Sequence, residues 1–348
     1  MNIQKLTYTL LFLVLLVHIL IVGQQLLAPL AWSAFLAILI LSPVQWLEKK
    51  GLPAPIAAIL SIVVLTSIIA AVLFFLSREV ISLIQDLPKL GSRFEGTLGE
   101  IQLFLTDKIG LSKEFQATQI ANSIEKFTEG GLAGVSQTLT SAAIAITYLT
   151  LMPLFIFFLI QYRKVYFEFL LQFGKGETRA QTAKVIQKVR NVIQQYLYGM
   201  ALVTLIMGVL FTIVLFGLGI KHALFFAVFL AVFNLIPYVG VFLSSLVTVL
   251  YVYLTNDTLF LPLLTLGLLW GLQIFENNLI TPYVVGSSVH ANPLAVIIAL
   301  LAGGMIWGVS GMVLFIPLIG ALRVILDEFE STKPFALLLG ESPKKASN

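Results

Sequence analysis

Residues 223–254 read ALFFAVFLAVFNLIPYVGVFLSSLVTVLYVYL, a run of 32 residues without Asp, Glu, Lys or Arg. A helix crosses the apolar part of a bilayer in about 20 residues, because each residue adds about 1.5 Å. The run is therefore too long for one straight crossing. Pro237 removes a helix hydrogen bond, and Gly240 permits unusual backbone shapes. The run predicts a membrane helix that breaks near its middle.

The composition of the whole chain agrees with a lipid environment. Of 348 residues, 59% are hydrophobic and 11% are charged, and the mean hydropathy is +0.99. A soluble domain carries about 25% charged residues, so a water-soluble enzyme is excluded. We expect an all-α, polytopic helical membrane protein with about eight spans and with broken or re-entrant helices in its C-terminal half.

Apolar runs and polar stretches divide the chain into six parts. They are three N-terminal spans (1–76), an external amphipathic helical region (77–134), a fourth span (135–160), a basic cytoplasmic helical region (161–198), a transport core (199–326) and a cytoplasmic tail (327–348). The first apolar run is expected to be a span and not a cleaved signal peptide, because Ala28-Pro29 makes a poor cleavage site. The second span is expected to break near Ser42-Pro43.

The distribution of basic residues predicts the orientation. Residues 161–198 hold seven Lys or Arg residues and two Glu residues, so the positive-inside rule makes this stretch cytoplasmic. Lys49-Lys50 points the same way. Both termini are then expected to face the cytoplasm, and the lipid bilayer is the first partner. The formal net charge of +4 and the absence of a groove-like basic cluster argue against nucleic acid as a partner.

Glu276 stands out in the C-terminal half. Between residues 191 and 322 the only other formal charges are Lys221 and Asp257, which lie at breaks between apolar runs. On a helix, Gln273, Glu276 and Asn277 would share one face. A carboxylate at membrane depth must face water, pair with another group or be protonated. Two interpretations stay open: a contact for an ion, proton or substrate, or a packing role with Asn277 and Asn278.

The break in the first run has an echo further along the chain. Asn234-Leu-Ile-Pro-Tyr-Val-Gly240 is followed by Asn278-Leu-Ile-Thr-Pro-Tyr-Val-Val-Gly286. We expect each copy to interrupt its helix, the first at Pro237 and Gly240 and the second at Pro282 and Gly286. Tyr238 would then lie beside a path for a substrate or ion. Paired interruptions of this kind point to a transporter's binding site.

A glycine pair further on, Gly304 and Gly308, matches the GxxxG pattern of closely packed membrane helices and is a third candidate for helix breaking and gating. Residues 293–325 hold this pair and are again too long for one straight crossing. We expect eight crossings in all. A re-entrant hairpin in either long segment is the alternative.

Motifs for catalysis or for a cofactor are absent from the sequence. There is no GxxxxGK[ST] phosphate loop, no HExxH and no cysteine, and the three histidines are scattered. We therefore expect no enzyme, no catalytic residue, no metal and no cofactor, and no ATP-driven transport by this chain alone.

The sequence resembles the autoinducer-2 exporter family of bacterial membrane proteins over nearly its whole length. The segment from Asn234 to Gly240 is similar to the family's N-x-I-P-Y-V-G signature. Glu276-Asn277, Pro282 and Gly286 are similar to its E-N-x-x-x-x-P-x-x-x-G signature. Val241 and Tyr283 depart from the family, where a proline and a basic residue often follow the two signatures.

The resemblance implies homo-oligomeric assembly and export of a small polar solute, autoinducer-2 in some members, or of sodium or lithium ions against protons in others. The first hypothesis is a secondary transporter with a path lined by Glu276, Asn277, Asn278, Gln273, Asn234 and Tyr238. A sodium or lithium/proton antiporter and a non-transporting membrane scaffold are the alternatives. The antiporter differs from the exporter in its driving ion. The scaffold differs from both in that the polar residues of the C-terminal half would end in packed contacts and would not converge on a cavity.

Overall fold

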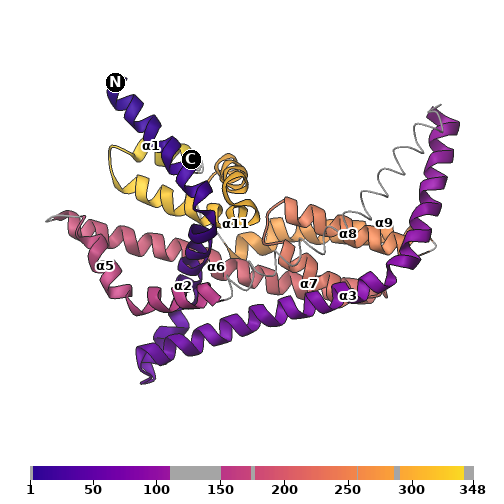
Figure 1. Cartoon of the computed structure of the whole chain (residues 1–348), viewed down its shortest axis with the longest axis horizontal. Coiled ribbons are helices and arrows are strands. Elements are labelled where there is room, and N and C mark those ends of the chain that lie inside the picture. Colours follow the sequence, from indigo (N-terminus) through magenta and orange to yellow (C-terminus); the bar gives the residue numbers. More distant parts are fainter. Residues whose placement is uncertain (1–2, 110–149, 174–176, 257, 286–290, 341–348) are drawn as a thin grey trace, which may run out of the picture.

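The computed structural model describes residues 3–109, 150–173, 177–256, 258–285 and 291–340. Within these ranges the regular elements are helices (Figure 1). A single isolated β-bridge pairs Ala291 with Gly340. The elements are α1 (Ile3–Val22), α2 (Gln24–Lys49), α3 (Ala54–Ile109), α5 (Arg163–Leu171), α6 (Glu177–Gly217), α7 (Ala223–Phe233), α8 (Val239–Thr255), α9 (Phe260–Phe275), the π-helical turn η1 (Glu276–Ile280), α10 (Thr281–Val284), α11 (Pro293–Glu328) and α12 (Lys333–Leu339).

The helices have the length and surface of a membrane protein. Among the described residues six segments are long and apolar enough to cross a bilayer: Ile3–Val22, Gln24–Lys49, Ala54–Val80, Arg179–Gly217, Phe260–Val284 and Pro293–Glu328. Three shorter helices, Thr150–Gln161, Ala223–Phe233 and Val239–Thr255, are also apolar. Large apolar side chains cover their outer faces, and no residue of α1 is buried. The expected fold class is confirmed.

The expected break at Ser42-Pro43 is wrong, because α2 continues through it to Lys49. Pro43 has no N–H, so the carbonyl of Leu39 loses its donor within the helix. The hydroxyl of Tyr198 on α6 donates to that carbonyl oxygen at 2.7 Å. One turn away, Gln194 Nε2 donates to Ser42 Oγ at 2.6 Å. A neighbouring helix thus replaces the missing bond.

Two predicted boundaries fall inside continuous helices. The third span and the first part of the region expected to be external form one helix, α3, and residues 110–134 of that region lie outside the described residues. Residues 135–149 of the expected fourth span also lie outside them. In Figure 1, α3 follows the long axis of the molecule and reaches beyond the other helices at one end. The basic helical region and the fifth span likewise join in α6, which α5 precedes.

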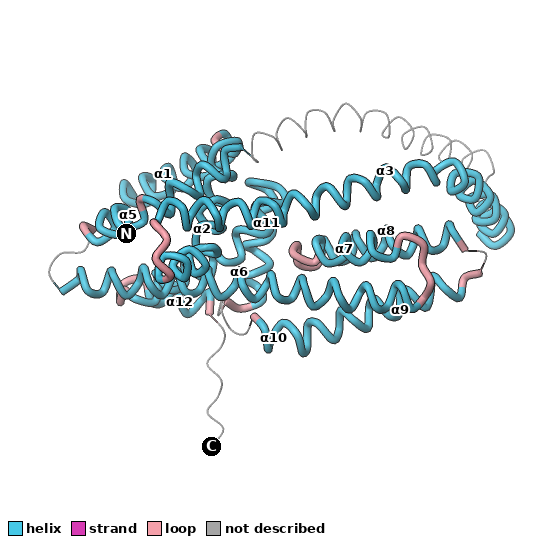
Figure 2. Tube along the Cα trace, turned by 90° about the horizontal axis from the view of Figure 1, so that it is seen from below, coloured by secondary structure: helices cyan, strands magenta, loops and turns pink. Residues whose placement is uncertain are grey.

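The first long segment folds back as a hairpin. The rings of Phe226 on α7 and Tyr251 on α8 lie 4.7 Å apart, while at the other end the backbones of Phe233 and Gly240 touch. These pairings make α7 and α8 antiparallel, and Figure 2 shows both between α3 and α9. The 11 residues of α7 span about 16 Å, roughly half the apolar thickness of a bilayer. The re-entrant alternative therefore fits residues 223–254.

The second long segment also turns back on itself. Within α11 the backbone leaves the helical region at Trp307 and at Gly308, whose φ of 58° and ψ of −138° suit glycine. The two arms, 293–306 and 309–328, meet where Gly303 packs on the backbone of Gly311. The interpretation of Gly304 and Gly308 as a packing pair on one helix face is wrong, because Gly308 forms the turn itself.

The α7–α8 hairpin predicts that residues at its two ends face the same side of the membrane. The chain contains no cysteine, so Lys221→Cys and Thr258→Cys each introduce one thiol. A membrane-impermeant maleimide should label both from one side of the membrane. Lys50→Cys, at the far end of α2, should be labelled from the other side. Labelling of residues 221 and 258 from opposite sides would show a full crossing instead.

The close contact inside α11 predicts a large effect of adding one methyl group. In Gly311→Ala the new Cβ would collide with the backbone of Gly303, so we expect the free energy of unfolding to fall by about 1–3 kcal/mol. Thermal unfolding of the protein in detergent measures this. Gly271→Ala in α9 is the control, because no atom lies within 4 Å of the position that its new Cβ would take. Equal melting temperatures for the two variants would contradict the hairpin contact.

Candidate functional site

Glu276 begins the π-helical turn η1 in the middle of a long helix. The N–H of Thr281 donates to the carbonyl of Glu276, five residues back, where an α-helix would bond four back. Such widened turns are often found at functional sites. Because the turn is wide, Pro282 fits directly after it and the helix continues to Val284. The expected helix break at Pro282 is thus a local widening, and Gly286 lies outside the described residues.

The carboxylate of Glu276 is enclosed and hydrogen-bonded by neutral donors. Glu276 is 6% exposed, and it is the one buried acidic residue among those whose side chains the structure describes. Oε1 accepts from Asn234 Nδ2 at 3.0 Å and from Thr281 Oγ1 at 3.4 Å. Oε2 accepts from Gln273 Nε2 at 2.6 Å. Two amides and a hydroxyl, and not a basic side chain, therefore satisfy the oxygens of this buried carboxylate.

Asn234 brings the tip of the α7–α8 hairpin to this carboxylate. It ends α7, and its amide crosses to η1, so the first copy of the echoed sequence meets the helix that carries the second. At the tip, Tyr238 has φ 62° and ψ −60°, and Val239 N donates to Pro237 O at 2.7 Å. This is a γ-turn of the rare, strained kind, which costs on the order of 1–3 kcal/mol. Strain of this size is concentrated at sites that bind or move.

A cavity of about 650 Å³ lies beside this contact and is lined by the hairpin tip, α9 and η1. Polar groups of Asn234, Gln273, Glu276, Asn277 and Thr281 line one part of it, and apolar side chains line the rest. The Oε1 atom of Gln273 is buried and receives no hydrogen bond from the described residues. The residues that line the cavity thus include a carboxylate and an amide oxygen without a hydrogen bond. Its lining is Met200, Asn234, Pro237, Tyr238, Val241, Phe242, Ser245, Leu266, Leu269, Trp270, Gln273, Glu276, Asn277 and Thr281.

Six residues singled out in the sequence therefore come together around one cavity: Asn234, Pro237, Tyr238, Gln273, Glu276 and Asn277. Asn278 does not join them, because its amide donates to the Ile274 carbonyl at 2.7 Å on the exposed side of the helix. Gly240 is buried in the hairpin contact, and Gly304 and Gly308 belong to the second hairpin.

Thr281 was missed in the sequence. On an α-helix it would lie away from Glu276, and only the π-turn brings its hydroxyl back to the carboxylate. The sequence did contain one sign of it, because Thr281 is an insertion in the second copy of the echo, between Ile280 and Pro282.

The comparisons with known proteins agree with this architecture. A family model described as the AI-2E family transporter matches residues 10–331. The chain belongs to the AI-2E transporter family.

Curated relatives of this AI-2E transporter cover most of its length. The "Putative transport protein YrrI" of Bacillus subtilis is 25% identical over 86% of both chains. The "Putative transport protein YhhT" of Escherichia coli K12 is 24% identical over 90% of this chain and 88% of its own. The "AI-2 transport protein TqsA" of E. coli K12 is 20% identical over 93% and 92%. A general role in membrane transport follows from the family, which is one of transporters and not of enzymes.

The hydrogen bond between Asn234 and Glu276 predicts a stability effect. Asn234→Ala removes one donor from a buried carboxylate, and we expect the free energy of unfolding to fall by about 1–3 kcal/mol. Asn278→Ala is the matched control. Because the hydrogen bond from its side-chain amide is exposed, we expect the free energy of unfolding to change by less than about 0.5 kcal/mol. In a Glu276→Gln background the effect of Asn234→Ala should shrink. Unfolding curves that give both asparagine variants the same loss would argue against this bond.

Proposed function

We propose that this AI-2E transporter is a secondary transporter that exports a small polar, autoinducer-2-like solute through the cavity at Glu276. The observation that carries the proposal is the hydrogen bond from Asn234, at a strained hairpin tip, to the one buried carboxylate of the described residues. Secondary transporters place such sites between interrupted helices near the middle of the membrane. A role in packing alone would leave no reason for a cavity with a free acceptor beside the carboxylate.

The chemistry of the cavity suits a small molecule with hydroxyl groups. The free Gln273 Oε1 and the carboxylate of Glu276 accept hydrogen bonds from hydroxyls, and the amide of Asn277 can donate or accept. Trp270 and Phe242 provide apolar walls for the carbon face of the solute. A few placed polar groups on a mostly apolar wall are typical of small-molecule sites.

Glu276 also provides a way to couple charge to movement. As a carboxylate it accepts from both Asn234 and Gln273, which holds the hairpin tip against α9. A proton or a cation on Glu276 changes which of these bonds it can accept. The two charge states therefore favour different positions of the hairpin, which is the differential interaction that a population shift requires.

Exchange of sodium or lithium ions for protons is the second candidate function. It is favoured by the hydroxyl oxygen of Thr281 beside the carboxylate of Glu276, in a cavity that Gln273 and Asn277 also line. Hard cations prefer oxygen ligands. Such a cation would replace the proton on Glu276 and use the same residues.

The setting of this site completes the proposal. Residues 161–198 would lie in the cytoplasm with both termini, and residues 77–134 would lie outside the bacterial inner membrane. The exposed apolar side chains of α1 support contact with lipid or with further copies in a homo-oligomer.

Glu276→Gln tests the proposal because glutamine keeps the shape of the side chain and removes its charge. In proteoliposomes with a proton gradient we expect solute flux to fall by about tenfold or more, the size of effect when one charge-assisted hydrogen bond is lost. Asn278→Ala, outside the cavity, should keep its flux. Elution volume and melting temperature show that both variants are folded.

The choice of solute separates the candidate functions. Export is supported if an autoinducer-2-like diol leaves vesicles that contain the unmodified protein but not vesicles that contain Glu276→Gln. Proton movement driven by sodium or lithium selects the antiporter. Wild-type flux in Glu276→Gln, or no flux of any of these solutes in the unmodified protein, would reject the transport site, and the second result would favour a scaffold.

A further inference from the structure

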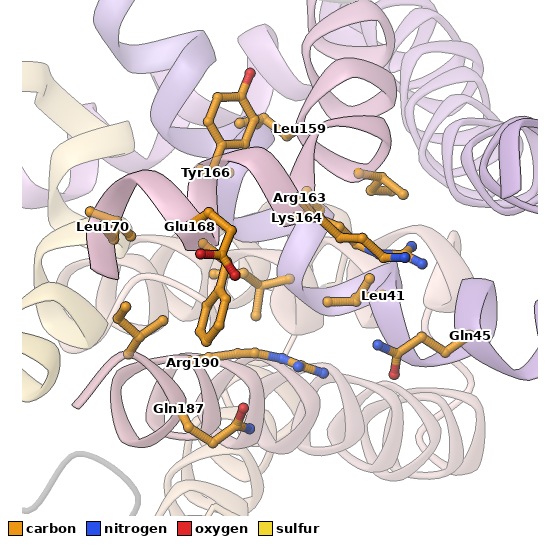
Figure 3. A pocket seen from close by; sticks show the side chains of 16 residues that line it. Leu41, Gln45, Leu159, Arg163, Lys164, Tyr166, Glu168, Leu170, Gln187 and Arg190 are labelled. Carbon is orange, nitrogen blue, oxygen red and sulfur yellow. The ribbon is translucent and has the colours of Figure 1, made fainter. Parts of the chain in front are cut away.

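A second cavity lies at the basic end of the helices and shares no residue with the one at Glu276. It has a volume of about 650 Å³ and lies between α2, α5 and α6 (Figure 3). Most of its lining is apolar and includes Ala34, Ile38, Leu41 and Leu159. Three basic residues, Arg163, Lys164 and Arg190, also line it. A mostly apolar cavity with three basic groups in its wall fits a molecule with an apolar tail and an anionic head.

Arg163 is fixed at this cavity by an ion pair, and one nitrogen of its guanidinium group has no acceptor. Its Nη2 donates to both carboxylate oxygens of Glu48, at 2.8 and 2.7 Å, and this pair connects the end of α2 to α5. Its Nη1 is buried and donates to no acceptor in the described residues. A buried guanidinium N–H without an acceptor is costly, so the site is complete only with an acceptor in the cavity.

Arg190 extends from α6 into the same space (Figure 3). Its Nε is also buried without an acceptor, and the described residues offer it no carboxylate within ion-pair distance. The one acidic residue in the wall, Glu168, already pairs with Arg179 at 2.9 Å. Two guanidinium groups with unused donors therefore belong to the wall of one cavity, and phosphate oxygens are acceptors that guanidinium groups bind well.

The surroundings of the cavity point to a lipid as the source of that phosphate. On α5 and beside it, Tyr162, Val165, Phe169 and Phe173 are exposed although they are large and apolar or aromatic. Aromatic and basic residues together are typical of the level of lipid headgroups. Basic pockets between membrane helices are known to bind anionic headgroups.

We propose that this cavity binds an anionic phospholipid from the leaflet at the basic end of the helices. The guanidinium groups of Arg163 and Arg190 donate to the phosphate oxygens, and the ammonium of Lys164 adds positive charge. One acyl chain lies along Ala34, Ile38 and Leu41. The bound lipid joins α5 and α6 to α2, at a distance from the transport cavity, and the binding does not depend on which solute is transported.

Arg190→Gln tests the proposal with little risk to folding, because Arg190 has no ion-pair partner to lose among the described residues. The purified full-length protein in detergent is titrated with dioleoylphosphatidylglycerol, and bound lipid is counted by native mass spectrometry. We expect affinity to fall by about fivefold in Arg190→Gln, as for loss of one basic group at a lipid headgroup. Lys184→Gln, an exposed lysine on the same helix outside the cavity, should bind as the unmodified protein does.

Two further probes identify the source of the phosphate. Dioleoylphosphatidylcholine, which has the same tails but no net charge, should bind more weakly than phosphatidylglycerol. Glycerol 1-phosphate, which has the head but no tail, should not displace the lipid. Phosphatidylglycerol should also raise the melting temperature of the unmodified protein more than that of Arg190→Gln.

Three results would overturn the lipid site. Undiminished phosphatidylglycerol binding by Arg190→Gln would remove the guanidinium from the site. An equal loss in Lys184→Gln would reduce the effect to diffuse surface charge. Displacement of the lipid by glycerol 1-phosphate would turn the cavity into a site for a water-soluble phosphate.

Discussion

The apolar core of a bilayer offers no hydrogen-bond partner to an interrupted helix, so every interruption in this chain must be satisfied by protein. At the hairpin tip the backbone does this locally: Ile236 N donates to Phe233 O, and Gly240 N donates to Ile236 O. The side chain of Asn234 remains, and Glu276 accepts from it. The packing of α7 and α8 among α3, α6 and α9 depends on this solution, and the candidate site is part of it.

The same requirement is met elsewhere by contacts between distant segments. Tyr198 supplies the donor that Pro43 removes from α2. At the second hairpin, Trp307 Nε1 donates to the Leu20 carbonyl at 2.9 Å and connects the turn of α11 to α1. In each of these contacts one donor satisfies one acceptor. The group around Glu276 differs from them, because Gln273 lines a cavity and its Oε1 atom receives no hydrogen bond from the described residues.

The two cavities have opposite electrostatic character, which suits different tasks. Around Glu276 the donors are neutral amides and a hydroxyl, and the carboxylate is the only formal charge among the described residues that line the cavity. Such a site can exchange a proton or a solute without separating an ion pair. Around Arg190 three basic residues outnumber the one acidic residue of the wall, Glu168, and Arg163 is held by Glu48. This arrangement suits a ligand that stays bound and holds helices together.

Much of this was determined by the sequence alone. Its composition required a lipid solvent, its prolines and glycines located the interruption at Pro237, and its charge pattern singled out Glu276, since these signals are local. The sequence did not determine the direction of the chain after an interruption. Pro237 reverses it, Pro43 leaves α2 continuous, and Pro282 follows a widened turn. The difference lies in which distant group supplies the missing bond, such as Tyr198 for α2. Only the tertiary structure brings those groups together, including Thr281 at Glu276 and Gly311 against Gly303.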